Sequence, residues 1–216
     1  ARPRATRAVA RIYSAAAGRL YEPLVVRRAF PLFGGDLNAH VAEHGRRAVA
    51  AAAGGGPILD MPVGTACFTT AVAAAHPGLV AGVDIAPGMV RAAAAAASRA
   101  GTPNLAVVCA DAHALPFADG AFGAVVCSNG LQVIPGARGA VAELARVLAP
   151  GGKLFVTVVG VPVGAALPRG AAARLPVVMR GRRDVVALLD DAGLRVTSSA
   201  RDRLALVVEA VKPPLR

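Results

Sequence analysis

Short apolar runs alternate with helix-like stretches from Pro57 onward. This alternation is typical of a parallel sheet that carries helices on both faces. The strands expected from it are residues 57–60, 79–85, 105–110, 121–127 and 153–160, and the helices between them are 69–75, 87–100 and 138–148. Pro150, Gly151 and Gly152 are helix breakers, so we expect them to end the last of these helices.

The last part of the chain has a different pattern. A helix closed by Gly193 is followed by two apolar strands, 194–198 and 204–211, with a short turn between them. Two strands joined by a short turn pair antiparallel. The whole pattern therefore predicts an α/β fold with a Rossmann-like, seven-stranded, mostly parallel sheet that ends in an antiparallel C-terminal hairpin.

Residues 1–50 are expected to be mainly helical, with one apolar face and arginines on the opposite face. The apolar face is Val9, Ile12, Tyr13, Ala16 and Leu20, and the arginines are Arg4, Arg7 and Arg11. We expect this segment to form a lid over a domain made of residues 51–216. The preferred interpretation leaves the arginines in water, and a weak contact with a membrane surface is the alternative. Residues 161–177 are rich in Pro, Gly and Ala and are expected to form a loop over the strand ends.

Composition narrows the class of protein. A length of 216 residues suits one domain, and the hydrophobic fraction of 55% contains no apolar run near the roughly 18 residues that a membrane span needs. The cysteines Cys67, Cys109 and Cys127 fall in predicted core segments without metal-ligand spacing. We therefore expect a cytoplasmic protein with no transmembrane helix, no disulfide framework and no metal site.

The formal net charge of +11 raises the question of a nucleic-acid partner. The arginines lie mostly before residue 50 and after residue 138, whereas the stretch that carries the expected strand ends is slightly acidic. Aromatic residues make up 4% of the chain and Trp is absent, which leaves few side chains for base stacking. No nucleic-acid partner is expected, although a nucleic-acid methyltransferase or binding protein stays an alternative.

Ligands of doubly wound sheets bind outside the carboxyl ends of the strands. The first three expected strands end at or near Asp60, Asp84 and Asp111, and the fourth ends at residues 127–129. Asp84 follows Asp60 by 24 positions, close to the ~20 expected for an acid that accepts hydrogen bonds from ribose hydroxyls. The strand ends therefore predict a ligand with a ribose.

Four segments resemble motifs of class I S-adenosylmethionine-dependent methyltransferases, in particular the small-molecule enzymes of the ubiquinone and menaquinone type. Residues 60–66 correspond to the family's Asp-x-Gly-x-Gly-x-Gly, but only the middle glycine, Gly64, is kept. "VDIAPGMV" and "DAHALPFADGAFGAVV" are similar to the second and third motifs, except that Gly123 replaces an Asp. "ELARVLAPGGKLFV" is similar to the segment that leads into the family's fifth strand.

The resemblance implies that S-adenosylmethionine is the cofactor and S-adenosylhomocysteine the product. It assigns the amino-acid end of the cofactor to Asp60 and Gly64, with the backbone near Cys127 helping. A glycine is required where φ is positive or where a Cβ would meet the ligand. Pro62 and Ala66 replace the other two glycines, which is compatible with a cofactor that brings no phosphate to the helix N-terminus.

The nucleoside end of the cofactor is assigned in the same way. The resemblance implies that Asp84 binds the ribose and that Ile85 and Met89 flank the adenine. Asp111 and the amide of Ala112 would read the adenine edge.

Methyl transfer from a sulfonium is an in-line displacement, so alignment and exclusion of water supply much of the acceleration. A base is needed only if the acceptor must lose a proton. The candidates for it are His113, Tyr13, Tyr21, His40 and His44. Gln132 stands where many relatives carry a histidine, and we expect it on the floor of the acceptor pocket.

These observations predict a methyltransferase that acts on a small-molecule acceptor such as a lipid, a quinone or a secondary metabolite. An NAD(P)-dependent oxidoreductase is the enzymatic alternative, and the glycine pattern and the terminal hairpin disfavour it. A protein that binds S-adenosylmethionine without transferring its methyl group is a further alternative.

Overall fold

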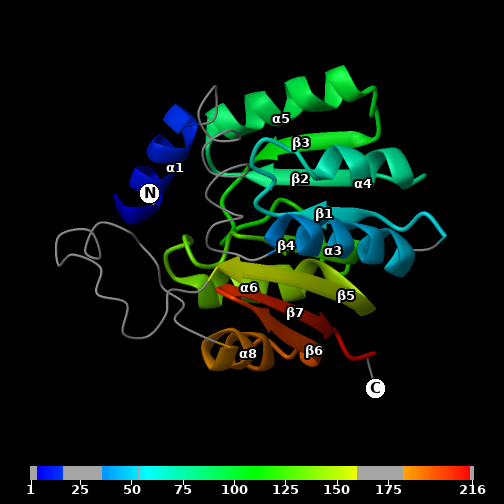
Figure 1. Ribbon diagram of the computed structural model, residues 1–216, viewed down its shortest axis with the longest axis vertical. Helices are drawn as coiled ribbons and strands as arrows, with labels where there is room; N and C mark the ends of the chain where they lie inside the picture. Colours follow the sequence, from blue (N-terminus) through cyan, green and yellow to red (C-terminus); the bar gives the residue numbers. More distant parts are fainter. Residues whose placement is uncertain (1–3, 17–35, 53, 160–181, 215–216) are drawn as a thin grey trace.

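Figure 1 shows the computed structural model of the chain, a seven-stranded sheet covered by helices on both faces. The structure describes residues 4–16, 36–52, 54–159 and 182–214. The helices are α1 (Arg4–Ala16), α3 (Leu37–Ala51), α4 (Thr69–Ala75), α5 (Pro87–Ala100), α6 (Ala137–Val147) and α8 (Arg182–Asp191). The strands are β1 (Ile58–Asp60), β2 (Val80–Asp84), β3 (Leu105–Cys109), β4 (Phe122–Ser128), β5 (Leu148–Val159), β6 (Arg195–Asp202) and β7 (Ala205–Val211).

The strand order across the sheet is β3-β2-β1-β4-β5-β7-β6. β1 pairs in parallel with both β2 and β4, and β7 pairs antiparallel with both β5 and β6. The predicted fold, a mostly parallel sheet that ends in an antiparallel hairpin, is confirmed. The chain moves outward in opposite directions from β1 and β4, and a crevice forms at such a reversal, outside the carboxyl ends of the strands.

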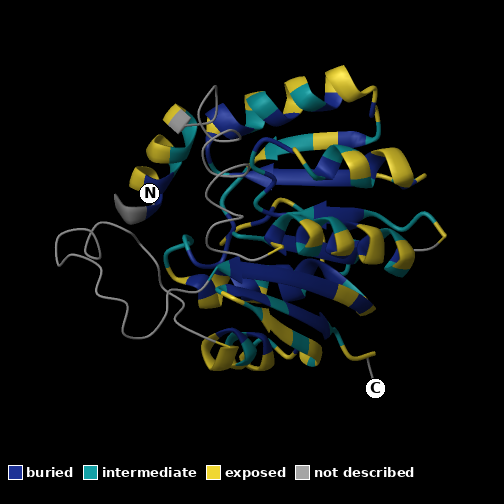
Figure 2. Ribbon diagram, viewed as in Figure 1, coloured by how far each residue is buried: buried dark blue, intermediate teal, exposed yellow. Residues whose placement is uncertain are grey.

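Side chains that alternate along each strand divide the core into two layers. On β4, Ala124 and Val126 pack with α3, α4 and α5, whereas Val125 and Cys127 pack with α6 and α8 on the other face. Figure 2 shows buried strands between helices whose outer faces are exposed. The apolar runs of the sequence are therefore strands that are covered on both sides.

α3 is part of this sandwich, although it falls within the segment expected to be a lid. Its buried face includes Val41, His44 and Ala48, and the ring of His44 lies 5.4 Å from that of Phe155 on β5. The helix therefore packs on the sheet itself, because its apolar stripe covers β4, β5 and β7.

α1 lies beyond the carboxyl ends of the strands, beside the first turn of α5 (Figure 1). The contact is close, because a Cβ added at Gly88 would lie 2.5 Å from the carbonyl oxygen of Ser14. The Gly88 N–H also donates to Ser14 Oγ at 3.3 Å. A glycine at this position of α5 thus lets the N-terminal helix pack directly over the strand ends.

β5 begins earlier than the sequence indicates. α6 ends at Val147 and the strand starts at Leu148, so the expected helix breakers at 150–152 lie inside the strand. Leu148 pairs with Phe122, and Gly151 and Gly152 exchange backbone hydrogen bonds with Lys212. Pairing with neighbouring segments thus outweighs the local preference of these residues for a turn.

Tyr21 and the expected loop at 161–177 lie outside the described residues. Within the part of the chain that the structure describes, none of the helices has the length and apolar character that crossing a bilayer requires.

Candidate functional site

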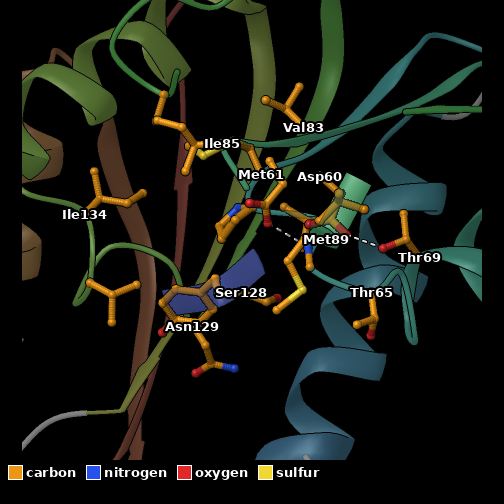
Figure 3. A pocket seen from close by; sticks show the side chains of 18 of the residues that line it. Asp60, Met61, Thr65, Thr69, Val83, Ile85, Met89, Ser128, Asn129 and Ile134 are labelled. Atoms are coloured by element: carbon orange, nitrogen blue, oxygen red, sulfur yellow. Dashed lines mark hydrogen bonds between the residues drawn. The ribbon is translucent and has the colours of Figure 1, made fainter. Parts of the chain in front are cut away.

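A cleft of about 1280 Å³, part of it open to solvent, lies at the carboxyl ends of β1, β2 and β4 (Figure 3). α1 closes one side of it with Thr6, Val9 and Tyr13, and α3 contributes Val41 and Gly45. Most of the site residues expected from the sequence line this one cleft, namely Tyr13, Asp60, Gly64, Asp84, Ile85, Met89, Asp111, Ala112 and His113.

Asp60 ends β1 at the centre of the cleft. Its Oδ2 accepts a hydrogen bond of 2.5 Å from Thr69 Oγ1 at the start of α4, drawn as a dashed line in Figure 3. Its Oδ1 is buried and has no hydrogen-bond partner among the described residues. Burial raises the pKa of Asp60 to about 7, and the nearby charge of Asp84 adds to the rise, while the bond from Thr69 opposes it. An unsatisfied buried carboxylate oxygen is costly, so this atom is suited to a cationic hydrogen-bond donor.

The turn after β1 is held by the backbone. The N–H of Val63 donates to the Val83 carbonyl at 2.8 Å, and the N–H of Ala66 donates to the Val63 carbonyl at 3.0 Å. Gly64 and Ala66 both have positive φ, at 55° and 59°. A glycine adopts this conformation without strain, whereas the alanine in place of the motif's last glycine adopts it at a cost of roughly 1–2 kcal/mol.

Pro62, in place of the motif's first glycine, follows a cis peptide bond and packs against Gly130. A Cβ at Gly130 would lie 2.2 Å from Cδ of Pro62. The proline ring therefore occupies space that is open only because residue 130, after β4, has no side chain.

Asp84 ends β2 and joins that strand to the turn. Its Oδ2 accepts the Gly64 N–H at 3.1 Å, and its Oδ1 accepts the Ala86 N–H at 2.9 Å. Burial raises the pKa of this carboxyl, and the backbone N–H groups partly offset the rise. Each oxygen has a second lone pair for a ligand hydroxyl.

Asp111 and His113 lie together after β3. Asp111 Oδ1 accepts the backbone N–H of His113 at 3.1 Å and lies 2.8 Å from its Nδ1. The other ring nitrogen, Nε2, lies 3.2 Å from the carbonyl oxygen of Gly136. His113 thus bridges Asp111 to the turn before α6, and neither ring nitrogen points at open space as a free base would.

Apolar side chains form the part of the cleft between these acids. Met89 is buried and packs with Ala86 against Tyr13 of α1. Burial, followed by the charge of Asp84, raises the pKa of the Tyr13 phenol, so this hydroxyl stays protonated at neutral pH. Ile85 and Ile134 also line the cleft (Figure 3).

Gln132 does not line the cleft, contrary to expectation. The expected contribution from the backbone near Cys127 stays a prediction, and the side chain of Cys127 itself does not line the cleft. Cys127 faces the α6 and α8 layer, while its neighbour Ser128 lines the cleft together with Asn129, because side chains alternate along a strand. Gln132 is buried in the next segment, and the residues after it, 133–135, supply the lining instead. The alternation of β4, counted from its apolar residues, was the signal that could have selected Ser128.

The other proposed bases lie elsewhere. His40 Nε2 pairs with Asp202 Oδ2 at 3.1 Å. His44 is buried against Phe155, and burial, followed by the charge of Arg47, lowers its pKa to about 4. Neither histidine lines the cleft.

Arg7 and Arg11 of α1 are exposed, as expected. Ile12 was expected on the apolar face with Val9 but is 61% accessible, because only one side of this helix packs on the rest of the chain. A weak contact of the exposed side of α1 with a membrane surface stays a prediction.

Comparisons with known proteins agree with this geometry. Residues 59–156 match the family model of the methyltransferase domain. The chain is 36% identical over 141 residues to the demethylmenaquinone methyltransferase of Beutenbergia cavernae and 41% identical over 127 residues to that of Thermus thermophilus. These alignments cover 63% and 57% of this chain but only 56% and 55% of the relatives, so the chain spans little more than half of their length.

Solved structures share the fold. A methyltransferase-like protein in complex with the Trm112 methyltransferase activator of Haloferax volcanii superposes with a TM-score of 0.73 at 18% identity, over 98% of this chain and 99% of that one. An S-adenosylmethionine-dependent methyltransferase from Aquifex aeolicus superposes with a TM-score of 0.67 at 18% identity, over 96% and 98%. These structures show the same fold, and the family model and the demethylmenaquinone methyltransferases confirm the resemblance to methyltransferases inferred from the sequence motifs.

Proposed function

We propose that this chain, a class I S-adenosylmethionine-dependent methyltransferase by sequence and fold, transfers a methyl group to a quinone-type small molecule. The observation that carries the proposal is that three acids from successive strand ends, Asp60, Asp84 and Asp111, line one cleft beneath the motif turn. Acids on three different strands share a cleft only if the sheet brings their ends together, as it does here.

The residues fit the cofactor group by group. Asp84, buried and still able to accept further hydrogen bonds, suits the ribose hydroxyls. Ile85 and Met89 suit the faces of the adenine, and Asp111 suits its edge. The buried, unpartnered Oδ1 of Asp60 suits the ammonium group of the amino-acid end.

When bound, the cofactor supplies a methyl group that is activated by the positive sulfur. The residues of this chain contribute alignment and exclusion of water, since α1 and α3 close two sides of the cleft. Neither His113 nor Tyr13 is arranged as a general base, because the ring nitrogens of the first are engaged and the pKa of the second is raised. This favours an acceptor that loses its proton readily, as the hydroxyl-bearing ring of a reduced quinone does.

The part of the cleft next to α3 favours an apolar acceptor. Val41, Phe68 and Val72 line it and carry no polar side-chain atom. Ser128 and Asn129 also line the cleft, with Ser128 Oγ buried and unpartnered among the described residues. An apolar wall with a few polar groups is typical of sites for small apolar ligands, and the demethylmenaquinone methyltransferases similar to this chain take their name from such an acceptor.

Calorimetric titration tests the cofactor. S-adenosylmethionine and S-adenosylhomocysteine are expected to bind and NAD is not. Asp84→Ala should weaken binding by at least about tenfold, or ~1.4 kcal/mol, because the ribose loses its acceptor. Asp119→Ala, which changes an exposed acid outside the cleft, is the matched control and should bind like the wild type.

Transfer is tested with a labelled methyl group and a reduced demethylmenaquinone analogue of short side chain. Label in the quinone supports the proposal. Binding of both cofactor forms without transfer to any quinone would leave a cofactor-binding protein, and equal binding of NAD would favour an oxidoreductase.

A further inference from the structure

The ring of His113 makes two hydrogen bonds, and both partners are oxygen atoms. Nδ1 lies 2.8 Å from Asp111 Oδ1, and Nε2 lies 3.2 Å from the carbonyl oxygen of Gly136. A carbonyl oxygen can accept a hydrogen bond but cannot donate one, and the same is true of an ionised carboxylate. Both ring nitrogens therefore donate, which requires the doubly protonated imidazolium form.

The surroundings of the ring agree with this form. Burial by itself lowers the pKa of His113, but the hydrogen bonds to Asp111 and to the Gly136 carbonyl outweigh it and raise the pKa above its usual value. Asp111 is the charged group that acts on the ring. On α6, Arg138 is paired with Asp191, and Glu143 is paired with Arg146.

The ring also connects two walls of the cleft that are distant in sequence. Asp111 follows β3, whereas Gly136 precedes α6 and follows the lining residues 133–135. Two glycines accommodate the ring, since a Cβ at Gly139 would lie 3.0 Å from His113 Cδ2 and one at Gly136 would lie 3.4 Å from Nε2. The ring therefore fits a space between these two segments that larger residues would fill.

We propose that His113 is a positioning residue for the cofactor, and that its imidazolium fixes Asp111 and the 133–136 wall in the arrangement that receives the adenine. This inference rests on the proposed function. Loss of the ring proton removes one of the two donors, so the two walls separate and the cofactor binds less tightly. The site consequently favours its cofactor at pH values below the pKa of His113.

A positioning role differs from that of a base in what it changes. A general base acts on the acceptor, so removal of a base lowers kcat. Removal of the His113 bridge should instead raise KM for the cofactor and leave kcat within about twofold.

The experiment combines protonation and affinity. Nitrogen NMR of the ring in the ligand-free protein should show both N–H groups of His113 at pH 6, and titration of one of them as the pH rises. The affinity for S-adenosylhomocysteine is then measured from pH 6 to pH 9 for the wild type, His113→Asn and His113→Gln. Asparagine retains a donor at the Nδ1 position and glutamine retains one near Nε2, and neither titrates.

Each variant should bind about fivefold more weakly than the wild type at pH 6, the equivalent of one hydrogen bond, and nearly equally at pH 9. The affinity of each variant is divided by that of the wild type at the same pH, which cancels the effect of every other titrating group. Thermal unfolding of each variant shows whether the fold is intact, and the partly exposed position of the ring makes this the expected result.

A neutral ring at pH 6, or a ratio that is constant across the pH range, would overturn the inference while leaving the proposed function intact. Failure of the wild type to bind S-adenosylhomocysteine at any pH would overturn both.

Discussion

The two ends of the cleft differ in how many of their polar groups have hydrogen-bond partners within the protein. At the proposed nucleoside end, each of the acids Asp84 and Asp111 accepts a hydrogen bond from a backbone N–H, and Asp111 also from the ring of His113. At the proposed amino-acid end, around Asp60 and the turn 61–66, one buried carboxylate oxygen has no partner among the described residues and Ala66 has positive φ. The nucleoside end is preorganised, whereas the amino-acid end holds unsatisfied and strained groups that a ligand or a substitution can relieve.

The same division separates the kept motifs from the altered one. "VDIAPGMV" and "DAHALPF" follow the family pattern at the nucleoside end, and both replaced glycines lie in the turn after β1. The turn nevertheless stays joined to β2 by the hydrogen bond from the Val63 N–H to the Val83 carbonyl. We infer that neighbouring residues compensate for the altered turn. Gly130→Ala, Asp60→Asn and Ala66→Gly test the difference between the two ends, in order of decreasing expected effect.

Gly130→Ala should have the largest effect. The new methyl group would lie 2.2 Å from Pro62 Cδ, and the ring is too rigid to yield, so we expect a loss of about 2 kcal/mol in the free energy of unfolding. Denaturant titration measures it.

Pro62→Gly in the same protein is the control for that prediction. Without the proline ring the added methyl group has room, so the double variant should recover at least about 1 kcal/mol relative to the sum of the two single changes. Strict additivity of the two changes would show that Gly130 does not compensate for Pro62.

This pair also marks the limit of what the sequence predicts. Asp60, Asp84 and Asp111 could be placed at one edge because apolar periodicity locates strand ends and parallel strands align those ends. The contact between residues 62 and 130 depends on which strand lies beside β1, and it leaves no local signal. The sequence placed the end of the fourth strand at residues 127–129 but did not show which of these side chains faces the cleft, because successive side chains of a strand point to opposite faces. The early start of β5 likewise depends on partners that local preferences do not contain.

Asp60→Asn should change how the affinity for S-adenosylhomocysteine depends on pH. Because the pKa of Asp60 is about 7, the carboxyl is mostly neutral at pH 6 and mostly ionised at pH 8. If the ionised form holds the cofactor's ammonium, the ratio of wild-type to variant affinity for S-adenosylhomocysteine should increase about tenfold between these pH values. A ratio that does not change with pH would remove Asp60 from ammonium binding.

The pH dependence of unfolding in the ligand-free protein gives an independent measure of the Asp60 pKa. The pKa of Asp60 is raised in the folded state from 3.8, so its contribution to stability is fully present below pH 3.8 and is lost as the pH rises through about 7. The variant does not titrate at this position. The wild type should therefore lose stability relative to Asp60→Asn between pH 5 and pH 8.

Ala66→Gly should have the smallest effect, because two opposing changes nearly cancel. Relief of the positive φ stabilises the folded state by roughly 1–2 kcal/mol, while the loss of a fully buried methyl group costs about 0.8 kcal/mol. The expected net gain is about 0.5 kcal/mol. Ala93→Gly is the matched control, since Ala93 is equally buried in the same core layer but lies within α5, where glycine adds a further cost of about 1 kcal/mol. The two alanine-to-glycine changes should therefore differ by about 2 kcal/mol in thermal or denaturant unfolding, and equal losses at both positions would mean that Ala66 stores no strain in the turn.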